Sequence, residues 1–456
     1  MKKNSIYSRW LPQHFFSVAK KRALIPLLVL GLSGAAAAQE VRPLSLQEAI
    51  TMGIENSKQL QLSQAKVEEA IARYNQTKDK ALPTGNVSYT YNHAEIPTTT
   101  FRMSEQGEPF YLPRRADAFI GTASLQEVLF SGNRLKYAQE TTGLLTQIAR
   151  LDVEKDEEEV AYHITEAYLS LYKLQQSQKV VNQNLEDVDR QINRAQRFFE
   201  QGLVTKNDVL RFQLQRSNIE LSQVDLETNR KIVVYNLALL LGLPEDADFV
   251  AQEVASPEQL AANLSTYLDS AMVNRQELRS LGLQQRVAEN NLKSVRAEKL
   301  PSVILGADAY FINPSGAFVP SKNSFIAPFT AGATVAWNFD ELWLNKNKAQ
   351  EAIVKRTEAD LGRLTAIDMV KTEVNKSYQQ YQQAKERVHI LEAAIAQARE
   401  NDRILESQYQ NKVATATDRI DAETQLFQQL VNLELAKADA ALAYYTLLKS
   451  TGNIIQ

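Results

Sequence analysis

One sequence pattern occurs twice in this chain, about 210 residues apart, and it limits the possible folds more than any other feature. The first copy spans residues 199–210 and the second spans residues 409–420. The two align without a gap, and the same register still pairs Gly242 with Gly452. The chain therefore contains an internal duplication, and any fold must account for two equivalent halves.

The N-terminal residues predict a cleaved secretory signal over residues 1–38. A basic leader precedes an apolar run from Ala23 to Leu32, and the small residues Ala36 to Ala38 follow it. The leader holds six of the 51 basic residues and none of the 54 acidic ones, which leaves 45 basic residues and a net charge of −9. An exported acidic chain is a poor candidate for nucleic-acid binding. The absence of cysteine excludes disulfides and thiolate metal sites.

Two long stretches of the sequence lack proline, the residue that most reliably breaks a helix. Within them, apolar residues follow alternating four- and three-residue steps over residues 160–199 and 388–409. This heptad spacing keeps one stripe of a helix against a partner helix, as in a coiled coil. Two polar residues interrupt the stripes, Gln178 in the first and Asp402 in the second.

Both heptad stretches lead into a predicted turn and a return helix. Gly202 can adopt the left-handed conformation that ends a helix. Thr205 stands three residues before Asp208, and Thr415 three residues before Asp418, which is the spacing of a capping box at a helix N-terminus. The predicted helical hairpins span residues 133–242 and 343–452.

Before each long helix the hydrophobic period changes to two, which predicts strands. The four predicted strands span about residues 85–93, 117–130, 302–312 and 327–339. Strands with one apolar face and one small or polar face are typical of a transmembrane barrel wall. The alternative is a soluble antiparallel sheet that is half-buried on a core. Because a membrane barrel needs about eight strands, several chains would share one barrel, and the strand count permits two, three or four.

We therefore predict a mixed α+β membrane protein with a duplicated order of helix, strand, strand, long helix and return helix. The first repeat covers residues 39–242 and the second covers residues 264–456. Residues 243–263, which include two prolines, form an equatorial linker beside the helices.

The whole pattern resembles the TolC-like outer membrane efflux proteins, or outer membrane factors. The resemblance covers nearly all of the chain after the signal and rests on the ordered duplication together with four local features. These are Leu82-Pro83 and Leu300-Pro301 before the strands, the Gly202-Leu203-Val204-Thr205 tip with the following Asp208-Val209-Leu210, and the second tip from Tyr409 to Asp421. The resemblance implies a homotrimer whose twelve strands, four per chain, form one β-barrel among outer membrane lipids. A long α-helical coiled-coil tunnel would continue it through the periplasm.

The same resemblance implies a function in transport. The chain would be the passive exit duct of a tripartite efflux pump or type I secretion system, opened at its periplasmic tip. Its partners would be a periplasmic adaptor protein and an inner membrane transporter of the RND or ABC type. The alternative is that the chain is itself a periplasmic coiled-coil adaptor, which would share the export signal and the helical hairpins.

Asp418 and Asp421 are the predicted pore constriction. They lie three residues apart on the return helix and so share a face. By resemblance they match two aspartates that line the periplasmic entrance of TolC-like channels, where a trimer would present six carboxylates to cations. The alternative is that Asp418 only caps its helix and that Asp421 is only solvated.

The resemblance also implies a gate at the tips. Tyr409 matches a tyrosine that holds the entrance closed in the family, and Asn207 and Asp208 match its partners' positions. The arginine that accompanies this tyrosine in the family is replaced by Ala414. Either Lys412 or Arg419 supplies that charge, or the closed state is weaker. The alternative is that Tyr409 is only the last residue of its heptad stripe and packs against the partner helix.

Two short segments are the predicted docking tips for the adaptor. The residues concerned are Gly202, Leu203 and Val204 in the first tip and Val413, Ala414 and Thr415 in the second. The alternative is that these are ordinary turn residues.

No catalytic set is recognisable in the sequence. The histidines have no metal-ligand spacing, and no phosphate-binding glycine loop or nucleophile motif occurs. We therefore expect neither enzymatic activity, nor a cofactor, nor a bound metal.

Overall fold

The computed structural model describes residues 42–95, 97, 100–102, 104–111, 115–253, 263–314 and 325–455. The predicted signal over residues 1–38 lies outside them. The described residues belong to one packing unit. No helix in the described part of the chain combines the length and the apolar character needed to cross a membrane.

The described elements follow the duplicated order that the sequence predicts, and this part of the prediction is confirmed. The first half contains α1 (Leu46–Asn56), α2 (Lys58–Asp79), β2 (Thr84–Glu95), β5 (Arg115–Phe130), α3 (Arg134–Glu200) and α4 (Lys206–Leu241). The second half contains α5 (Leu264–Asn274), α6 (Gln276–Ala297), β7 (Ser302–Pro314), β8 (Phe329–Ala336), α7 (Glu341–Gln410) and α8 (Ala416–Thr451). Four short strands are additional: β1 (Arg42–Leu44), β3 (Thr100–Phe101), β4 (Phe110–Tyr111) and β6 (Phe249–Ala251).

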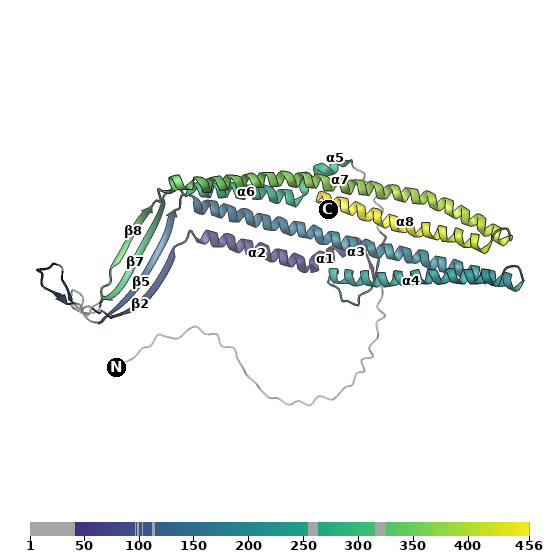
Figure 1. The fold of residues 1–456 in the computed structure, drawn as a ribbon, viewed down its shortest axis with the longest axis horizontal. Helices are drawn as coiled ribbons and strands as arrows, with labels where there is room; N and C mark the ends of the chain where they lie inside the picture. The colour runs from purple at the N-terminus through teal and green to yellow at the C-terminus, as the bar shows by residue number, and fades with distance from the viewer. Residues whose placement is uncertain are drawn as a thin grey trace, which may run out of the picture. The chain divides into compact units, whose positions relative to one another are not determined.

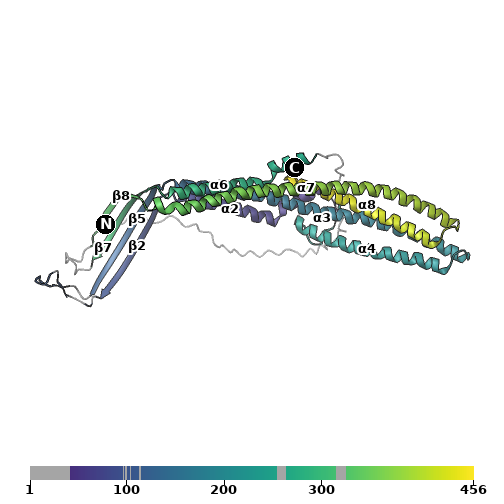
Figure 2. The ribbon, with the colours of Figure 1, turned by 45° about the horizontal axis from the view of Figure 1, so that its top comes forward.

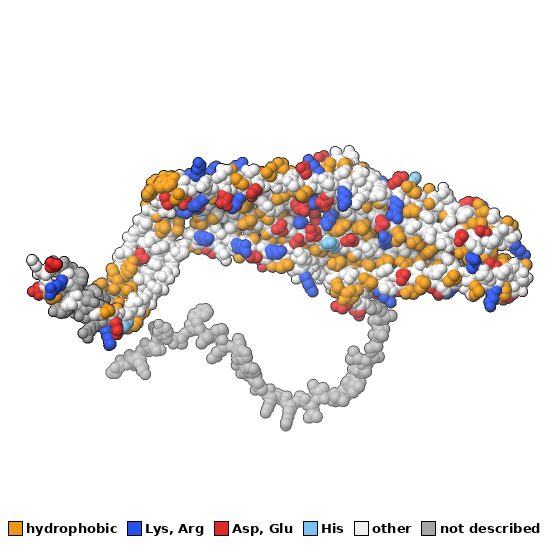
Figure 3. All heavy atoms as spheres, in the orientation of Figure 1, with side chains coloured by type: hydrophobic (Ala, Val, Ile, Leu, Met, Phe, Trp, Pro, Cys, Tyr) orange, Lys and Arg blue, Asp and Glu red, His pale blue; other side chains and the backbone are white. Residues whose placement is uncertain are grey.

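The four long strands form one antiparallel sheet in the order β2, β5, β7, β8. In Figure 1 this sheet lies at one end of the long helices, and the two hairpin tips lie at the other end. Every residue of β2 and β8 is exposed, including Val87 at 82% and Phe329 at 70%. The face drawn in Figure 3 shows few charged side chains on the strands. The sheet thus carries apolar side chains that nothing in the described chain covers.

The strand β8 ends at Ala336, short of the expected residue 339. The indole N–H of Trp337 donates to the carbonyl of Lys299, with 3.0 Å between the nitrogen and the oxygen. The N–H of Glu341 then donates to the carbonyl of Asn338, which begins the first turn of α7. The chain therefore leaves the sheet to enter the long helix.

The long helices pair as two hairpins, α3 with α4 and α7 with α8, and these pairs lie side by side in Figures 1 and 2. Both return helices end on glycines in the left-handed conformation, at φ 70° for Gly242 and 74° for Gly452. Glycine has no Cβ to clash there, so it terminates a helix at little cost. The two return helices therefore end in the same way.

A buried core near the middle of the helices fixes the first hairpin to the N-terminal segment. The strands β1 and β6 pair in parallel, although about 200 residues separate them. Tyr168 on α3 lies beneath this pair, is 1% exposed, and donates its hydroxyl to the carbonyl of Leu44 at 2.7 Å. Part of the expected linker over residues 243–263 therefore packs into the core through β6.

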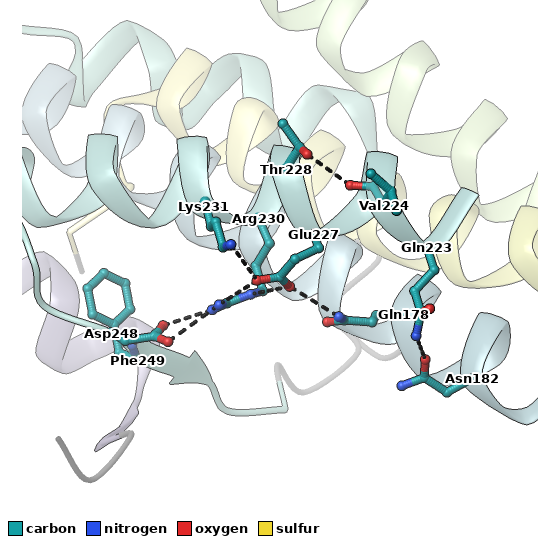
Figure 4. Close-up of polar contacts among 10 residues, drawn as sticks. All are labelled: Gln178, Asn182, Gln223, Val224, Glu227, Thr228, Arg230, Lys231, Asp248 and Phe249. Atoms are coloured by element: carbon teal, nitrogen blue, oxygen red, sulfur yellow. Dashed lines mark hydrogen bonds and ion pairs between the residues drawn. The ribbon is translucent and has the colours of Figure 1, made fainter. Parts of the chain in front are cut away.

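The polar interruption of the first heptad stripe has a partner across the hairpin. The side-chain amide of Gln178 donates to Glu227 on α4 at 3.2 Å. Glu227 also accepts from Arg230, whose guanidinium donates to Asp248 at 2.8 Å, as Figure 4 shows. The stripe is therefore polar at this level because Gln178 donates a hydrogen bond to an ion-pair network that joins α4 to the segment before β6.

Candidate functional site at the hairpin tips

The two hairpin tips share one backbone geometry. Gly202 has φ 71°, and the equivalent residue in the second tip, Lys412, has φ 62°. In each tip the next residue donates its N–H to the carbonyl five residues earlier, at 2.8 Å. This bond pattern closes the C-terminus of a helix. Lysine adopts the left-handed conformation here at a cost that glycine avoids.

Each return helix begins with the predicted capping box. The hydroxyl of Thr205 accepts from the N–H of Asp208 at 3.3 Å, and the N–H of Thr205 donates back to the Asp208 carboxylate at 2.8 Å. In the second tip, Thr415 and Asp418 make the same two bonds at 3.2 Å and 3.0 Å. The bonds from the Thr415 hydroxyl and backbone N–H lower the pKa of Asp418. The capping spacing read from the sequence is confirmed in both tips.

The other aspartate of the predicted constriction is exposed. Asp421 lies near the start of α8, one turn from Asp418, and both carboxylates reach solvent in this single chain. Asn207 is exposed at the start of α4. The structure therefore leaves Asp418, Asp421 and Asn207 accessible to a neighbouring copy of the chain.

The predicted docking residues lie at the very ends of the hairpins. Gly202, Leu203, Val413 and Thr415 are exposed, and Val204 and Ala414 are half-buried. Val413 is 75% exposed, which is a large exposure for an apolar side chain. Ala414 packs against the apolar cluster that surrounds Tyr409.

Tyr409 lies between the two hairpins and is only 5% exposed. Its ring contacts Phe198 on α3 and Phe212 on α4, with centroid distances of 6.2 Å and 5.9 Å. Burial, and after it the charge of Asp208, raise the pKa of Tyr409. The buried hydroxyl has no hydrogen-bond partner within the described residues, so the expected bonds to Asn207 and Asp208 are not formed in the single chain.

A buried ion-pair network lies behind the second tip. Arg419 on α8 is 5% exposed, and its guanidinium donates to Glu406 at 2.6 Å and to Asp402 at 2.5 Å, both on α7. Glu406 also pairs with Arg194 on α3. Burial opposes ionisation of Glu406, but the two arginines outweigh it and lower its pKa. The network therefore joins the two helices of the second hairpin and connects them to the first hairpin.

This network explains the polar break in the second heptad stripe and shows where the two nearby cations lie. Asp402 interrupts the second heptad stripe because it receives a bond from Arg419. Of the two cations considered in place of the family arginine, Arg419 is engaged in ion pairs, whereas Lys412 is exposed at the turn. No pattern in the sequence singles out Arg194 or Glu406. The polar residue in an apolar stripe was the signal that pointed to this level of the helices.

The sequence and the fold were compared with those of known proteins. A family model described as "Outer membrane efflux protein" matches residues 49–243 and again residues 267–453. Each match begins and ends close to the limits of one structural repeat. The family model thus detects the same duplication that the sequence shows.

Individual relatives share about a quarter of their aligned residues with this chain. The outer membrane efflux protein BepC of Brucella suis is 23% identical, and the match covers 96% of this chain and 91% of BepC. The alkaline protease secretion protein AprF of Pseudomonas aeruginosa is 24% identical over 58% of this chain and 55% of AprF.

Among solved structures, the outer membrane protein VceC of Vibrio cholerae superimposes with a TM-score of 0.73 at 16% identity, covering 90% of this chain and 97% of VceC. Its similarity shows a shared fold. Because the two matches of the family model together cover most of the sequence, the chain belongs to the outer membrane efflux protein family, as an outer membrane channel protein and not an enzyme.

Proposed function

We propose that three copies of this chain form one duct through the outer membrane. The observation that carries this proposal is the incomplete sheet. Within the described residues β2 and β8 each pair on one side only, and their side chains are exposed. Unpaired backbone groups are costly in lipid, and four strands cannot close a barrel. Three copies would supply twelve strands, as the resemblance to TolC-like channels implies.

The duct would serve efflux or secretion as a passive conduit. BepC is described as an efflux protein and AprF as a protease secretion protein, so relatives of this chain include both kinds. The helical hairpins would extend into the periplasm and meet an adaptor protein, with an RND or ABC transporter in the inner membrane. The adaptor role for the chain itself finds less support, because it gives no purpose to a sheet with exposed apolar strands.

The tips would contain the entrance and its gate. Asp418 and Asp421 would line the pore in the trimer, because their carboxylates are exposed on one face at the start of α8. Tyr409 would hold the tips together with Asn207 and Asp208 of a neighbouring hairpin, since its hydroxyl is buried without a partner in one chain.

The docking surface for the adaptor would be the exposed ends of both turns. The apolar and small residues there are available to a partner's helical tips. The first turn contributes Gly202, Leu203 and Val204, and the second contributes Val413, Ala414 and Thr415.

A planar-bilayer experiment tests the constriction. The variant Asp418→Asn with Asp421→Asn should lose most of the cation selectivity and the block by trivalent cations, because a ring of carboxylates is neutralised. Glu200→Gln is the matched control, since it removes an exposed carboxylate of the first tip that has no part in the proposed gate or constriction, and it should leave selectivity and block unchanged. Unchanged selectivity and block in the double variant would place the constriction elsewhere.

A further inference from the structure

A cavity of about 570 Å³ lies between the two hairpins, behind the tips, and no role has yet been assigned to it. Its walls come from α3, α7 and α8. One part of the lining is apolar and includes Leu426, Phe427 and Leu430 of α8. The remaining part is polar and includes the Arg419 network. The cavity therefore offers an apolar surface and a charged surface to one occupant.

Four acceptor atoms on the polar side of this cavity receive no hydrogen bond of normal geometry from the described residues, although the Gln191 side chain lies near enough to Glu423 to lower its pKa. They are the side-chain carbonyl oxygens of Asn184 and Gln191 on α3 and both carboxylate oxygens of Glu423 on α8. All three side chains are more than nine-tenths buried, with residue exposures of 8%, 6% and 5%. Buried acceptors without donors are unfavourable, and a buried carboxylate without a partner is more so. The unpaired atoms are all of one kind, so the missing occupant is a donor.

The cations around Glu423 do not supply this donor. Arg419, one turn away on the same helix, directs its bonds to Asp402 and Glu406. On α3, Arg194 pairs with Glu406 and Arg190 with Asp187. On α7, Arg399 lines the cavity without a hydrogen bond to the Glu423 carboxylate. Glu423 therefore remains a buried carboxylate with charged neighbours of both signs. The positive neighbours are Arg190 and Arg194 on α3, Arg399 on α7 and Arg419 on α8. The negative neighbours are Asp187 on α3 and Asp402 and Glu406 on α7.

We propose that this cavity is a binding site for an organic cation that carries a guanidinium or primary ammonium group. The cationic group bonds to Glu423, Gln191 and Asn184, and its N–H donors match the acceptors that lack partners. The apolar part of the ligand packs on Leu426, Phe427 and Leu430. A free small molecule or an arginine or lysine side chain of a partner can present this chemistry.

A proton competes with the cation for the same carboxylate. Burial is the main cause that raises the pKa of Glu423, to about 7. A raised pKa means that the folded protein favours the neutral form of Glu423. The contribution of Glu423 to the free energy of unfolding is therefore fully present below the ordinary pKa of 4.5, and it is lost as the pH rises through about 7. The affinity for a cation follows the opposite course: it rises as the pH increases through about 7 and Glu423 ionises, and it falls as the pH decreases.

Calorimetric titration of the full-length protein in detergent tests the site. The probe is benzylguanidinium, and benzylurea is its uncharged match. We expect benzylguanidinium to bind at pH 8 and to bind at least about tenfold more weakly at pH 5.5. Glu423→Gln should weaken binding at pH 8 by at least about tenfold and remove most of the pH dependence. Glu392→Gln, an exposed change on α7, is the matched control and should leave binding unchanged.

A second variant and a second probe complete the test. Gln191→Leu removes one acceptor and keeps the charge, so it should weaken binding severalfold without removing the pH dependence. If N-acetylarginine amide binds as tightly as benzylguanidinium, the natural occupant is an arginine side chain of a partner. If only benzylguanidinium binds, the natural occupant is a free organic cation. Binding that is the same in Glu423→Gln, or no binding to either probe, would overturn the site and leave the channel proposal untouched.

Discussion

The two hairpins have the same backbone at their tips but differ in the side chains that join their helices just behind the tips. In the second hairpin, Arg419 joins α8 to Asp402 and Glu406 on α7. In the first hairpin the register of the repeat places Val209, Ile192 and Gln196 at these three positions. Val209 is buried in an apolar cluster that includes Ile192. Just behind the tip, the helices of the first hairpin thus meet through apolar side chains, and those of the second meet through buried charges.

The charges on the return helices differ in the same way. Asp421 in the second tip corresponds to Arg211 in the first, whereas both tips keep the capping aspartate. The second tip therefore presents two carboxylates near the start of its return helix, and the first presents one carboxylate and one guanidinium. The two tips thus share one backbone geometry and differ in the charges that they present.

The largest expected effect comes from breaking the buried charge. Arg419→Met leaves Asp402 without its arginine partner and Glu406 with Arg194 alone, which should destabilise the second hairpin near its tip by about 3 kcal/mol. Hydrogen exchange of the amides in the last turns of α7 and the first turns of α8 measures this loss. Ile192→Val in the first hairpin is the control, with an expected cost of about 1 kcal/mol.

A further variant replaces the whole Arg419 ion-pair network by the residues found in the first hairpin. The triple variant Arg419→Val, Asp402→Ile, Glu406→Gln gives the second hairpin the residues of the first, and it should recover the protection that Arg419→Met loses. Apolar residues of suitable volume often match or exceed a buried ion pair in stability. Full protection in the single variant Arg419→Met would show that the ion pairs do not hold the tip.

The next effect concerns the side chain of Tyr409, which lies between the two hairpins. Tyr409→Phe gives the second tip the residue found at the equivalent position 199 in the first. If the hydroxyl bonds to a neighbouring hairpin in the trimer, its loss costs about 1 kcal/mol and shifts the balance toward the open state by roughly fivefold. Single-channel conductance should rise, and Phe199→Tyr should leave it unchanged. A conductance equal to that of the parent protein would assign the gate to other residues.

The smallest effect concerns the turn itself. Lys412→Gly should stabilise the second turn by about 1 kcal/mol, because glycine adopts the left-handed conformation without a Cβ penalty. Gly202→Ala should cost about the same amount in the first turn, where a Cβ would meet no atom within 4 Å and only the backbone conformation matters. Exchange rates of the turn amides report both changes. Equal rates in parent and variants would mean that the turns are held by their neighbours.

Much of the fold follows from periodicity. The heptad stripes, the period-two strands and the two capping boxes predict the order of elements, because local spacing decides which face of each element is apolar. The partners of polar residues do not follow from spacing. Asp402 interrupts its stripe in the sequence, but only the packed helices show that Arg419 comes from the opposite helix of the hairpin.

Three other features could not be predicted from local patterns in the sequence. The parallel pair of β1 and β6 joins three-residue strands that lie far apart in the chain, so neither strand has a pattern long enough to recognise. Lys412 adopts a conformation that its residue type disfavours, and the turn is set by the bonds on either side of it. Glu423 gave no signal either, because an acidic residue on a long helix is usually solvated.

The unpaired edges of the sheet have a consequence for biogenesis. The apolar clusters around Tyr168 and Tyr409 lie within one chain, so the helical part can acquire its packing as a monomer. The strands β2 and β8 offer free backbone groups to any other strand, and such edges are prone to wrong pairing. Correct partner strands must therefore reach the sheet before unrelated ones do. The yield of functional protein should depend on how many copies arrive together at the site of insertion.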